Sequence, residues 1–319
     1  MKRILTVAGL FVSLACAFFF FRSVAHHWSA LNQVNWNHRV WSSLTLALAI
    51  YISTYALVSF AWGRSLKALG HPLRYHTTLR IMLLSQFAKY LPGNVGHHVG
   101  RILLAKREGL PTETVLGGML LDTLIVLAAA CACSLPTLHL LIQVASQQSA
   151  THAHATASLI AVGFAFVVGV FLLFPSIRRA LVHQLRHITH LIRREKLPLL
   201  GMAWVTHCAS FLAGGTALHM LCIAFTPGIH AQHWIEVTGI YASAWLLGFL
   251  MPGAPAGLGV REVVLLLGLS PLIGTEPATA AAATLRLVTT LGDGLAFTLG
   301  LALHPRQRKV TQNLDIHSS

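Results

Sequence analysis

Charged residues are scarce in this chain, and acidic residues are the scarcest. Only 10% of the 319 residues are charged, with 9 Asp and Glu against 23 Lys and Arg. A soluble domain carries roughly 25% charged residues, so this composition excludes an ordinary soluble fold. With 55% hydrophobic residues and a mean hydropathy of +0.66, the sequence predicts an all-α integral membrane protein. Its length suits a single polytopic membrane domain, 1–319, of about seven to nine helical elements at about 20 residues per crossing.

Signatures of catalysis, nucleotide binding and metal binding are also lacking. The chain has no GxSxG, no HExxH, no P-loop and no GxGxxG that opens a helix after a strand. We therefore expect no enzymatic activity and no cofactor, and any transport is facilitated, exchanging or ion-coupled. His139, His152 and His154 lack the spacing of a defined site, so we expect no metal. The five cysteines form no CxxC pair and are interpreted as small apolar residues.

Lysine and arginine gather in short segments, at 64–80, 175–198 and 304–319. By the positive-inside rule these segments are cytoplasmic, and the loops 136–156 and 226–234, which lack both residues, are external. This pattern accounts for the formal charge of +14 without nucleic acid as a partner. It predicts a multi-pass membrane protein with both termini in the cytoplasm. The segment 175–198 is interpreted as a surface helix on anionic lipid, or else as a docking face for an envelope-biosynthesis enzyme.

Uninterrupted apolar runs predict about six transmembrane helices. They are expected at about 4–24, 41–62, 115–135, 157–174, 199–225 and 277–303. The first run follows Met1-Lys2-Arg3 and is similar to a signal peptide. Its length and the lack of a clean cleavage site favour an uncleaved helix.

Two further apolar runs, at about 79–107 and 235–272, are each interrupted by Pro-Gly and then carry an arginine. The first reads Leu91-Pro92-Gly93-Asn94-Val95-Gly96 before Arg101, and the second reads Met251-Pro252-Gly253 before Gly257 and Arg261-Glu262. Proline removes a backbone donor and glycine permits unusual dihedrals, so a helix stops and restarts at each point. Inside a bilayer such a break is tolerated only where protein or a watery cavity receives the freed backbone groups.

The charges around the two interrupted runs differ. Arg80 precedes the first run and Lys106-Arg107 ends it, so both of its ends are predicted to be cytoplasmic. The second run follows a loop without Lys or Arg and is followed by Glu276, so both of its ends are predicted to be external. Each run is then a re-entrant helical hairpin, one from each face. This is an inverted-topology repeat, with repeat one at about 41–135 and repeat two at about 199–303.

The two interrupted motifs resemble those of the flippase-like family built on the lysylphosphatidylglycerol synthase transmembrane region. The resemblance covers essentially the whole chain, and it implies a lipid-translocating domain with two re-entrant hairpins. It also implies a place in the bacterial plasma (inner) membrane, and stand-alone members of the family are associated with glycolipid, hopanoid or polyprenyl pathways. The chain has no aminoacyl-transferase domain, so it looks unable to make lysylphosphatidylglycerol. Ala254-Pro255-Ala256 stands where a second glycine is usual, which would stiffen the second hairpin.

Ionisable residues inside predicted membrane segments are candidates for a substrate site, because each is costly there and needs a partner. Such arginines could bind a phosphodiester, and the carboxylates would hold or release them. The alternative is structural, with buried pairs that neutralise each other and lock the hairpins. The expected substrate-binding residues are Gly93, Asn94, Gly96, Arg101, Asp122, Gly253, Gly257, Arg261, Glu262 and Arg286.

Other polar residues flank the same breaks. Lys89 and the pair His97-His98 adjoin the first break, where the histidines could carry protons or lie at the headgroup interface, and we favour the interface. Asp293 lies near the cytoplasmic half of the last helix, and the sequence assigns it no role.

The leading functional hypothesis is transbilayer, flippase-like movement of an anionic membrane lipid. A phospholipid, a polyprenyl-phosphate-linked sugar and a hopanoid-related lipid all fit. One alternative is a membrane enzyme acting on a lipid phosphate, which would need Glu262 or Asp122 to face headgroups. Another is an accessory subunit of an envelope glycolipid or glycosyltransferase pathway. The sequence gives no signal for an oligomeric state, a coupling ion or the direction of transport.

Overall fold

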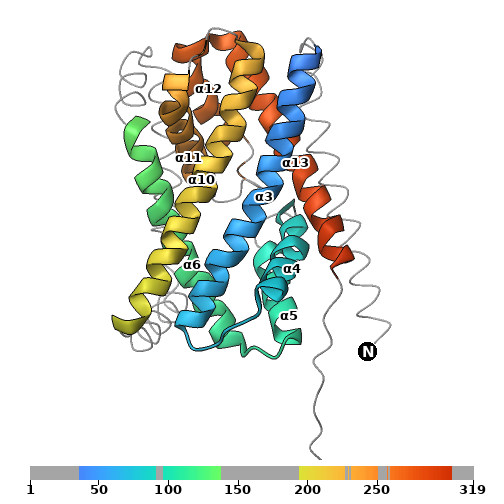
Figure 1. The fold of residues 1–319 in the computed structure, drawn as a ribbon, viewed down its shortest axis with the longest axis vertical. Helices are drawn as coiled ribbons and strands as arrows, with labels where there is room; N and C mark the ends of the chain where they lie inside the picture. Colours follow the sequence, from blue (N-terminus) through green and yellow to red (C-terminus); the bar gives the residue numbers. More distant parts are fainter. Residues whose placement is uncertain are drawn as a thin grey trace, which may run out of the picture.

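The computed structural model describes residues 36–90, 96–137, 194–226, 229, 231–250, 257 and 259–303. Across these residues all regular structure is helical, with α-helices joined by short 3₁₀ turns (Figure 1). The prediction of an all-α fold is confirmed for this part of the chain.

Four of the helices are long and apolar enough to cross a membrane within the described ranges. They are α3 (His38–Ala68), α6 (Thr112–Ser134), α10 (Leu197–Phe225) and α13 (Thr275–Ala302). These match the crossings that we predicted at 41–62, 115–135, 199–225 and 277–303. The other two predicted crossings, 4–24 and 157–174, lie outside the described residues.

Local sequence signals explain where the long helices begin and end. The Asn37 side chain accepts a hydrogen bond from the Val40 N–H at 3.0 Å, which satisfies one free donor at the start of α3. Gly70, with φ of 89°, follows the end of α3 in a conformation that glycine adopts at little cost. Pro111, in an extended conformation, precedes α6, and Pro198 lies in the first turn of α10, where no donor is lost.

Each predicted interrupted run is divided into two shorter helices. The first helix pair comprises α4 (Tyr75–Gln86), the 3₁₀ turn η1 (Phe87–Tyr90) and α5 (Gly96–Arg107). The second helix pair comprises α11 (Trp234–Leu250) and α12 (Val260–Ile273). Both Pro-Gly sequences fall between the two helices of a pair, in residues that the structure does not describe.

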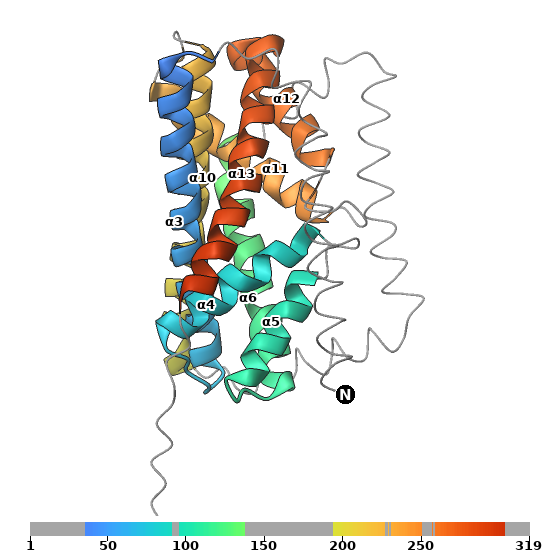
Figure 2. The same ribbon diagram turned by 90° about the vertical axis from the view of Figure 1, so that its right-hand side faces the viewer.

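The two helix pairs occupy opposite ends of the bundle. Figure 2 shows α4 and α5 in its lower half and α11 and α12 in its upper half. The helix ends that flank each interruption, here called the joined ends, lie toward the right-hand side in both pairs. Helix α13 contacts α4 of the first pair and α12 of the second, whereas α3 and α10 pack extensively against each other. The joined ends of both pairs approach each other near mid-height on one side of the bundle (Figure 2).

Buried apolar residues form separate clusters in the two halves. The larger cluster joins α3, α10, α11, α12 and α13 and includes Leu44, Leu218 and Ile240. A second cluster joins α3, α4, α5 and α6 around Trp62 and Met82. Close helix contacts depend on small residues, as is usual in membrane proteins. The part of α3 between the clusters is more polar and faces the cavity described below.

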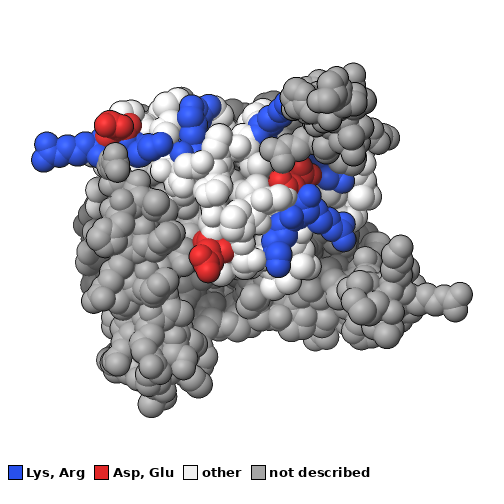
Figure 3. Space-filling model, turned by 90° about the horizontal axis from the view of Figure 1, so that it is seen from below, with Lys and Arg blue, Asp and Glu red and all other residues white. Residues whose placement is uncertain are grey.

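The lower end of the bundle is basic. It comprises the end of α3, the start of α4, the end of α5 and the start of α10, and exposed Lys67, Arg74, Lys106, Arg107 and Arg194 belong to these segments. Figure 3 shows basic side chains on this lower face, with a few acidic ones among them.

Candidate functional site

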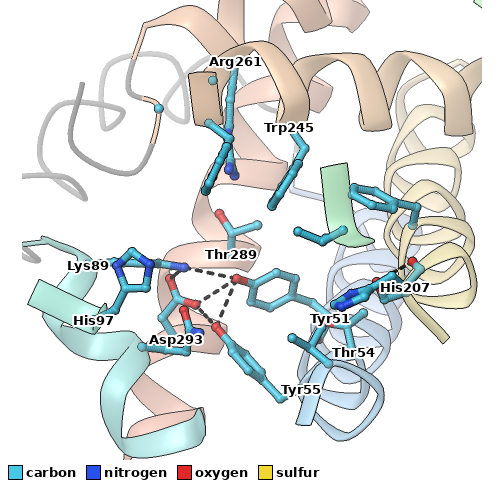
Figure 4. A pocket seen from close by; sticks show the side chains of 18 of the residues that line it. Tyr51, Thr54, Tyr55, Lys89, His97, His207, Trp245, Arg261, Thr289 and Asp293 are labelled. Atoms are coloured by element: carbon cyan, nitrogen blue, oxygen red, sulfur yellow. Dashed lines mark hydrogen bonds and ion pairs between the residues drawn. The ribbon is translucent and has the colours of Figure 1, made fainter. Parts of the chain in front are cut away.

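A cavity of about 210 Å³ lies where the joined ends of the two helix pairs approach the long helices. Side chains from all eight described α-helices line it, so residues far apart in the sequence meet there. A single buried water needs roughly 10–15 Å³ on a comparable measure, so the space is large enough for several waters or a polar group. Figure 4 shows the cavity from close by, with Arg261 directed into it from above and Lys89 from the side.

Charged side chains are concentrated around this cavity. Its wall contains four basic residues and two carboxylates, and a third carboxylate lines a small adjoining pocket. They are Lys89, Arg101, Arg261 and Arg286, with Asp122 and Asp293 on the wall and Glu262 in the adjoining pocket. Three of the chain's nine acidic residues are thus placed here, although burial of a charge is costly without a partner.

Asp122 of α6 joins the first helix pair to α10. Its Oδ2 lies 3.7 Å from Arg101 Nη1, and its Oδ1 lies 3.0 Å from His207 Nε2. All three side chains are buried, and the Arg101 guanidinium lies 5.2 Å from the centre of the Trp62 ring. Two of the expected site residues, Asp122 and Arg101, therefore face each other, and His207 is a further partner that the sequence reasoning missed. Histidine on an apolar helix gave no signal that it would face Asp122.

Asp293 of α13 is fully buried and is the centre of a second cluster. Lys89 Nζ lies 2.6 Å from its Oδ2, and the Tyr51 and Tyr55 hydroxyls both donate to its Oδ1 (Figure 4). The sequence assigned Asp293 no role and placed Lys89 only beside a break. The rule that selected Asp122, a carboxylate within a predicted crossing, applies equally to Asp293 and would have found it.

Glu262 of α12 contacts both a neighbouring helix and the start of its own helix. Its Oε1 lies 2.9 Å from Arg286 Nε of α13, and its Oε2 accepts a hydrogen bond of 2.7 Å from the Gly259 N–H. The second contact caps the N-terminus of α12, where a negative charge is favoured. We expected the carboxylates to hold or release the arginines without assigning a partner to each, and the structure places Glu262 against Arg286 and not against its neighbour Arg261. The physical reason is that consecutive residues of a helix do not face each other.

Arg261 is held in a slot between two glycines. A Cβ atom on Gly248 would lie 2.5 Å from Arg261 Cγ, and one on Gly257 would lie 2.9 Å from Arg261 Nε. Gly257 also has a φ of +72°, which disfavours any other residue. Within the described residues Arg261 makes no ion pair, and its Nε is buried without a hydrogen-bond partner. Its guanidinium therefore retains its capacity to bind an anion.

The remaining predicted residues are distributed as follows. Gly257 lines the cavity, whereas Gly96 begins α5 and is not part of the wall. His97 and His98 both line the cavity, with their ring centres 3.8 Å apart. Among the described residues no group of three or more potential ligands could hold a metal. The predicted site residues Gly93, Asn94 and Gly253, and the loop histidines His139, His152 and His154, lie outside the described residues.

Comparison with known proteins agrees with this architecture. The chain matches the family described as the lysylphosphatidylglycerol synthase TM region over residues 6–296. No curated protein matches the chain. The family match spans nearly the whole sequence, so the chain belongs to this family. It is a multi-pass membrane protein of a family related to membrane lipids.

Proposed function

We propose that this protein moves an anionic lipid across the bilayer, with the lipid headgroup held in the central cavity. The observation that carries the proposal is the lining of that cavity. Four basic side chains and both helix pairs converge on a space in the middle of an apolar bundle. A polar cavity inside an apolar bundle offers a negatively charged headgroup both water and partners.

The arrangement of the two helix pairs supports alternating access to the cavity. We propose that each pair is a re-entrant hairpin, that the two hairpins are related as an inverted repeat, and that they enter from opposite faces of the membrane. The support is their placement at opposite ends of the bundle with their joined ends directed to one side (Figure 2). In transporters with inverted repeats, interrupted helices meet at a central site, and rocking of one repeat against the other exposes it to each face.

The proposed orientation places the basic lower end in the cytoplasm of a bacterial cell, at the plasma membrane. Its support is the positive charge on that end of the bundle (Figure 3). A phospholipid, a polyprenyl-phosphate-linked sugar and a hopanoid-related lipid all remain candidate cargoes under this proposal. The family relationship supports a lipid of this general kind.

The pairing of the carboxylates favours transport over catalysis on a lipid phosphate. An enzyme would require Asp122 or Glu262 as a general acid or base available to the headgroup. Asp122 faces Arg101 and His207, and Glu262 faces Arg286 and the backbone of Gly259. These carboxylates therefore act as partners that position basic side chains. The role as an accessory subunit has no comparable support among the described residues.

The proposal is tested by reconstitution of the purified full chain in liposomes with a fluorescent anionic phospholipid. Movement to the other leaflet is measured by the fraction of the label that a membrane-impermeant reductant can quench. We expect the wild-type chain to move the lipid, and Arg101→Ala and Glu262→Ala to reduce the rate. Arg107→Ala, an exposed arginine at the end of α5, is the control. Full activity of both cavity variants in a folded protein would remove the proposed site, and an inactive wild-type chain would contradict the function.

A further inference from the structure

The charges around the cavity do not cancel. Among the described residues, four basic side chains face three carboxylates, counting Glu262 of the adjoining pocket, which leaves one net positive charge when the histidines are neutral. Three of the basic residues are already opposite a carboxylate: Lys89 with Asp293, Arg101 with Asp122, and Arg286 with Glu262. The excess charge therefore resides on Arg261.

The shortage of carboxylates holds for almost the whole chain. Of its nine acidic residues only Asp315 lies outside the described residues. Those not at the cavity lie at or near helix ends, where Glu113, Glu236 and Glu276, for example, occupy the first turns of α6, α11 and α13. Apart from Asp315 no carboxylate is left to neutralise Arg261.

We infer that the cavity selects a headgroup with one net negative charge, as in a phosphodiester, and that Arg261 determines this selection. The inference rests on the proposed function and specifies its substrate class. A single negative charge makes the loaded cavity neutral, which minimises the cost of burying charge in a bilayer. A dianionic phosphomonoester would leave one negative charge in excess, and a zwitterionic headgroup would leave the positive charge of Arg261 uncompensated.

The geometry of Arg261 suits a phosphodiester. The guanidinium is a planar fork that donates two parallel hydrogen bonds to two phosphate oxygens. Gly248 and Gly257 confine the side chain, so it is already directed into the cavity before a ligand binds (Figure 4). A second anionic charge would have to draw Lys89, Arg101 or Arg286 away from its carboxylate, which would leave that carboxylate unpaired.

The test measures binding by the full chain in detergent at pH 8, where histidine is neutral and a phosphomonoester carries nearly two charges. Short-chain phosphatidylglycerol, phosphatidate and phosphatidylcholine are the monoanionic, dianionic and zwitterionic probes. Each dissociation constant is obtained from the rise of the unfolding temperature with lipid concentration. We expect phosphatidylglycerol to bind at least about tenfold more tightly than the other two lipids. Equal affinities for the three lipids would overturn the inference.

Two positions adjust the cavity charge independently. Arg261→Gln removes the excess charge, and Gln86→Glu neutralises it with Arg261 in place, since Gln86 also lines the cavity. Both variants should lose the preference for phosphatidylglycerol. Gln86→Lys adds a positive charge and should shift the preference toward phosphatidate. Arg107→Gln changes the total charge outside the cavity and should retain the wild-type preference. An unchanged preference in Arg261→Gln and Gln86→Glu would overturn the inference.

The same measurements separate failure of the inference from failure of the proposed function. Transport of phosphatidylglycerol and phosphatidate at equal rates in liposomes would contradict the inference and preserve the function. Dimethyl phosphate is a monoanionic phosphodiester without acyl chains. If it bound as tightly as phosphatidylglycerol, the ligand would be a soluble phosphodiester, which would support the charge selection and contradict lipid transport.

Discussion

Lys89, in the turn η1 of the first helix pair, forms an ion pair of 2.6 Å with Asp293 of α13. Arg286 lies two helical turns earlier on α13 and therefore on the same face, and its Nε lies 2.9 Å from Glu262 of the second helix pair. One face of α13 thus forms an ion pair with each helix pair. In the first ion pair α13 supplies the carboxylate, and in the second it supplies the guanidinium. A movement of either pair relative to α13 must break or exchange one of these ion pairs.

The first prediction concerns the stability that the Lys89–Asp293 pair contributes. Lys89→Met leaves Asp293, which is 0% exposed, without its cationic partner. Loss of one partner of a buried pair costs about 3–5 kcal/mol, and we expect the lower end because Tyr51 and Tyr55 still donate to Asp293. The free energy of unfolding is measured in detergent by denaturant titration.

The control for this substitution is Lys67→Met, at an exposed position near the end of α3. Its effect should stay within about 0.5 kcal/mol, as for most surface substitutions. The double variant Lys89→Met with Asp293→Asn should recover part of the loss, since no buried carboxylate is left unpaired. Strictly additive losses would mean that the two residues do not stabilise each other.

The sequence predicted the helices well because their signals are local. The lengths of the apolar runs predicted α3, α6, α10 and α13. The two Pro-Gly sequences predicted the interruptions between the helices of each pair. The rule on intramembrane charges also selected Arg101, Asp122, Arg261 and Glu262, all of which line the cavity or the pocket beside it.

The pairing of those charges could not be predicted from the sequence. Which carboxylate faces which arginine depends on how helices distant in the chain rotate against each other. Arg261 and Glu262 are adjacent in the sequence but face different directions, so Glu262 reaches Arg286. His207 and Tyr51 lie on helices that the composition marks only as apolar, and their contacts with Asp122 and Asp293 emerge only in the folded bundle.

The second prediction concerns the slot that holds Arg261. In Gly248→Ala the added methyl group would lie 2.5 Å from Arg261 Cγ, so the arginine must leave its position. Because a flexible side chain can move, the fold should be retained. We expect phosphatidylglycerol to bind about tenfold more weakly, as for removal of a charge-assisted hydrogen bond. The dissociation constant is measured by thermal shift.

Gly63→Ala is the matched control, because a methyl group there meets only the Thr78 side chain at 3.6 Å, an ordinary contact distance. Its affinity for phosphatidylglycerol should equal that of the wild-type chain. Unaltered affinity in a folded Gly248→Ala protein would show that the position of Arg261 does not matter for binding.

The third prediction concerns the contact between α10 and α11. In Gly215→Ala the added methyl group would lie 2.3 Å from Thr238 Oγ1 and 2.7 Å from the Thr238 Cα, so the backbone itself must shift. Overpacking of this kind costs about 1–3 kcal/mol. On the same helix, Gly201→Ala meets no atom within 4 Å and should stabilise the protein by up to about 1 kcal/mol through helix propensity. Unfolding temperatures in detergent provide the comparison, and equal shifts at both positions would refute the close contact.

The fourth prediction concerns how the two helix pairs enter the membrane. Single cysteines are introduced in a cysteine-free chain by Arg74→Cys and Arg107→Cys at the outer ends of the first helix pair. Ile235→Cys and Glu276→Cys mark the ends of the second, and all four positions are exposed. If the pairs are re-entrant from opposite faces, an impermeant thiol reagent labels 235 and 276 in intact cells, and labels 74 and 107 only after permeabilisation. Labelling of 74 and 107 from different sides, or of 235 and 276 from different sides, would make that pair a crossing of the bilayer. The two interrupted helices would then no longer enclose a central site from opposite faces, and the basis for alternating access would be lost.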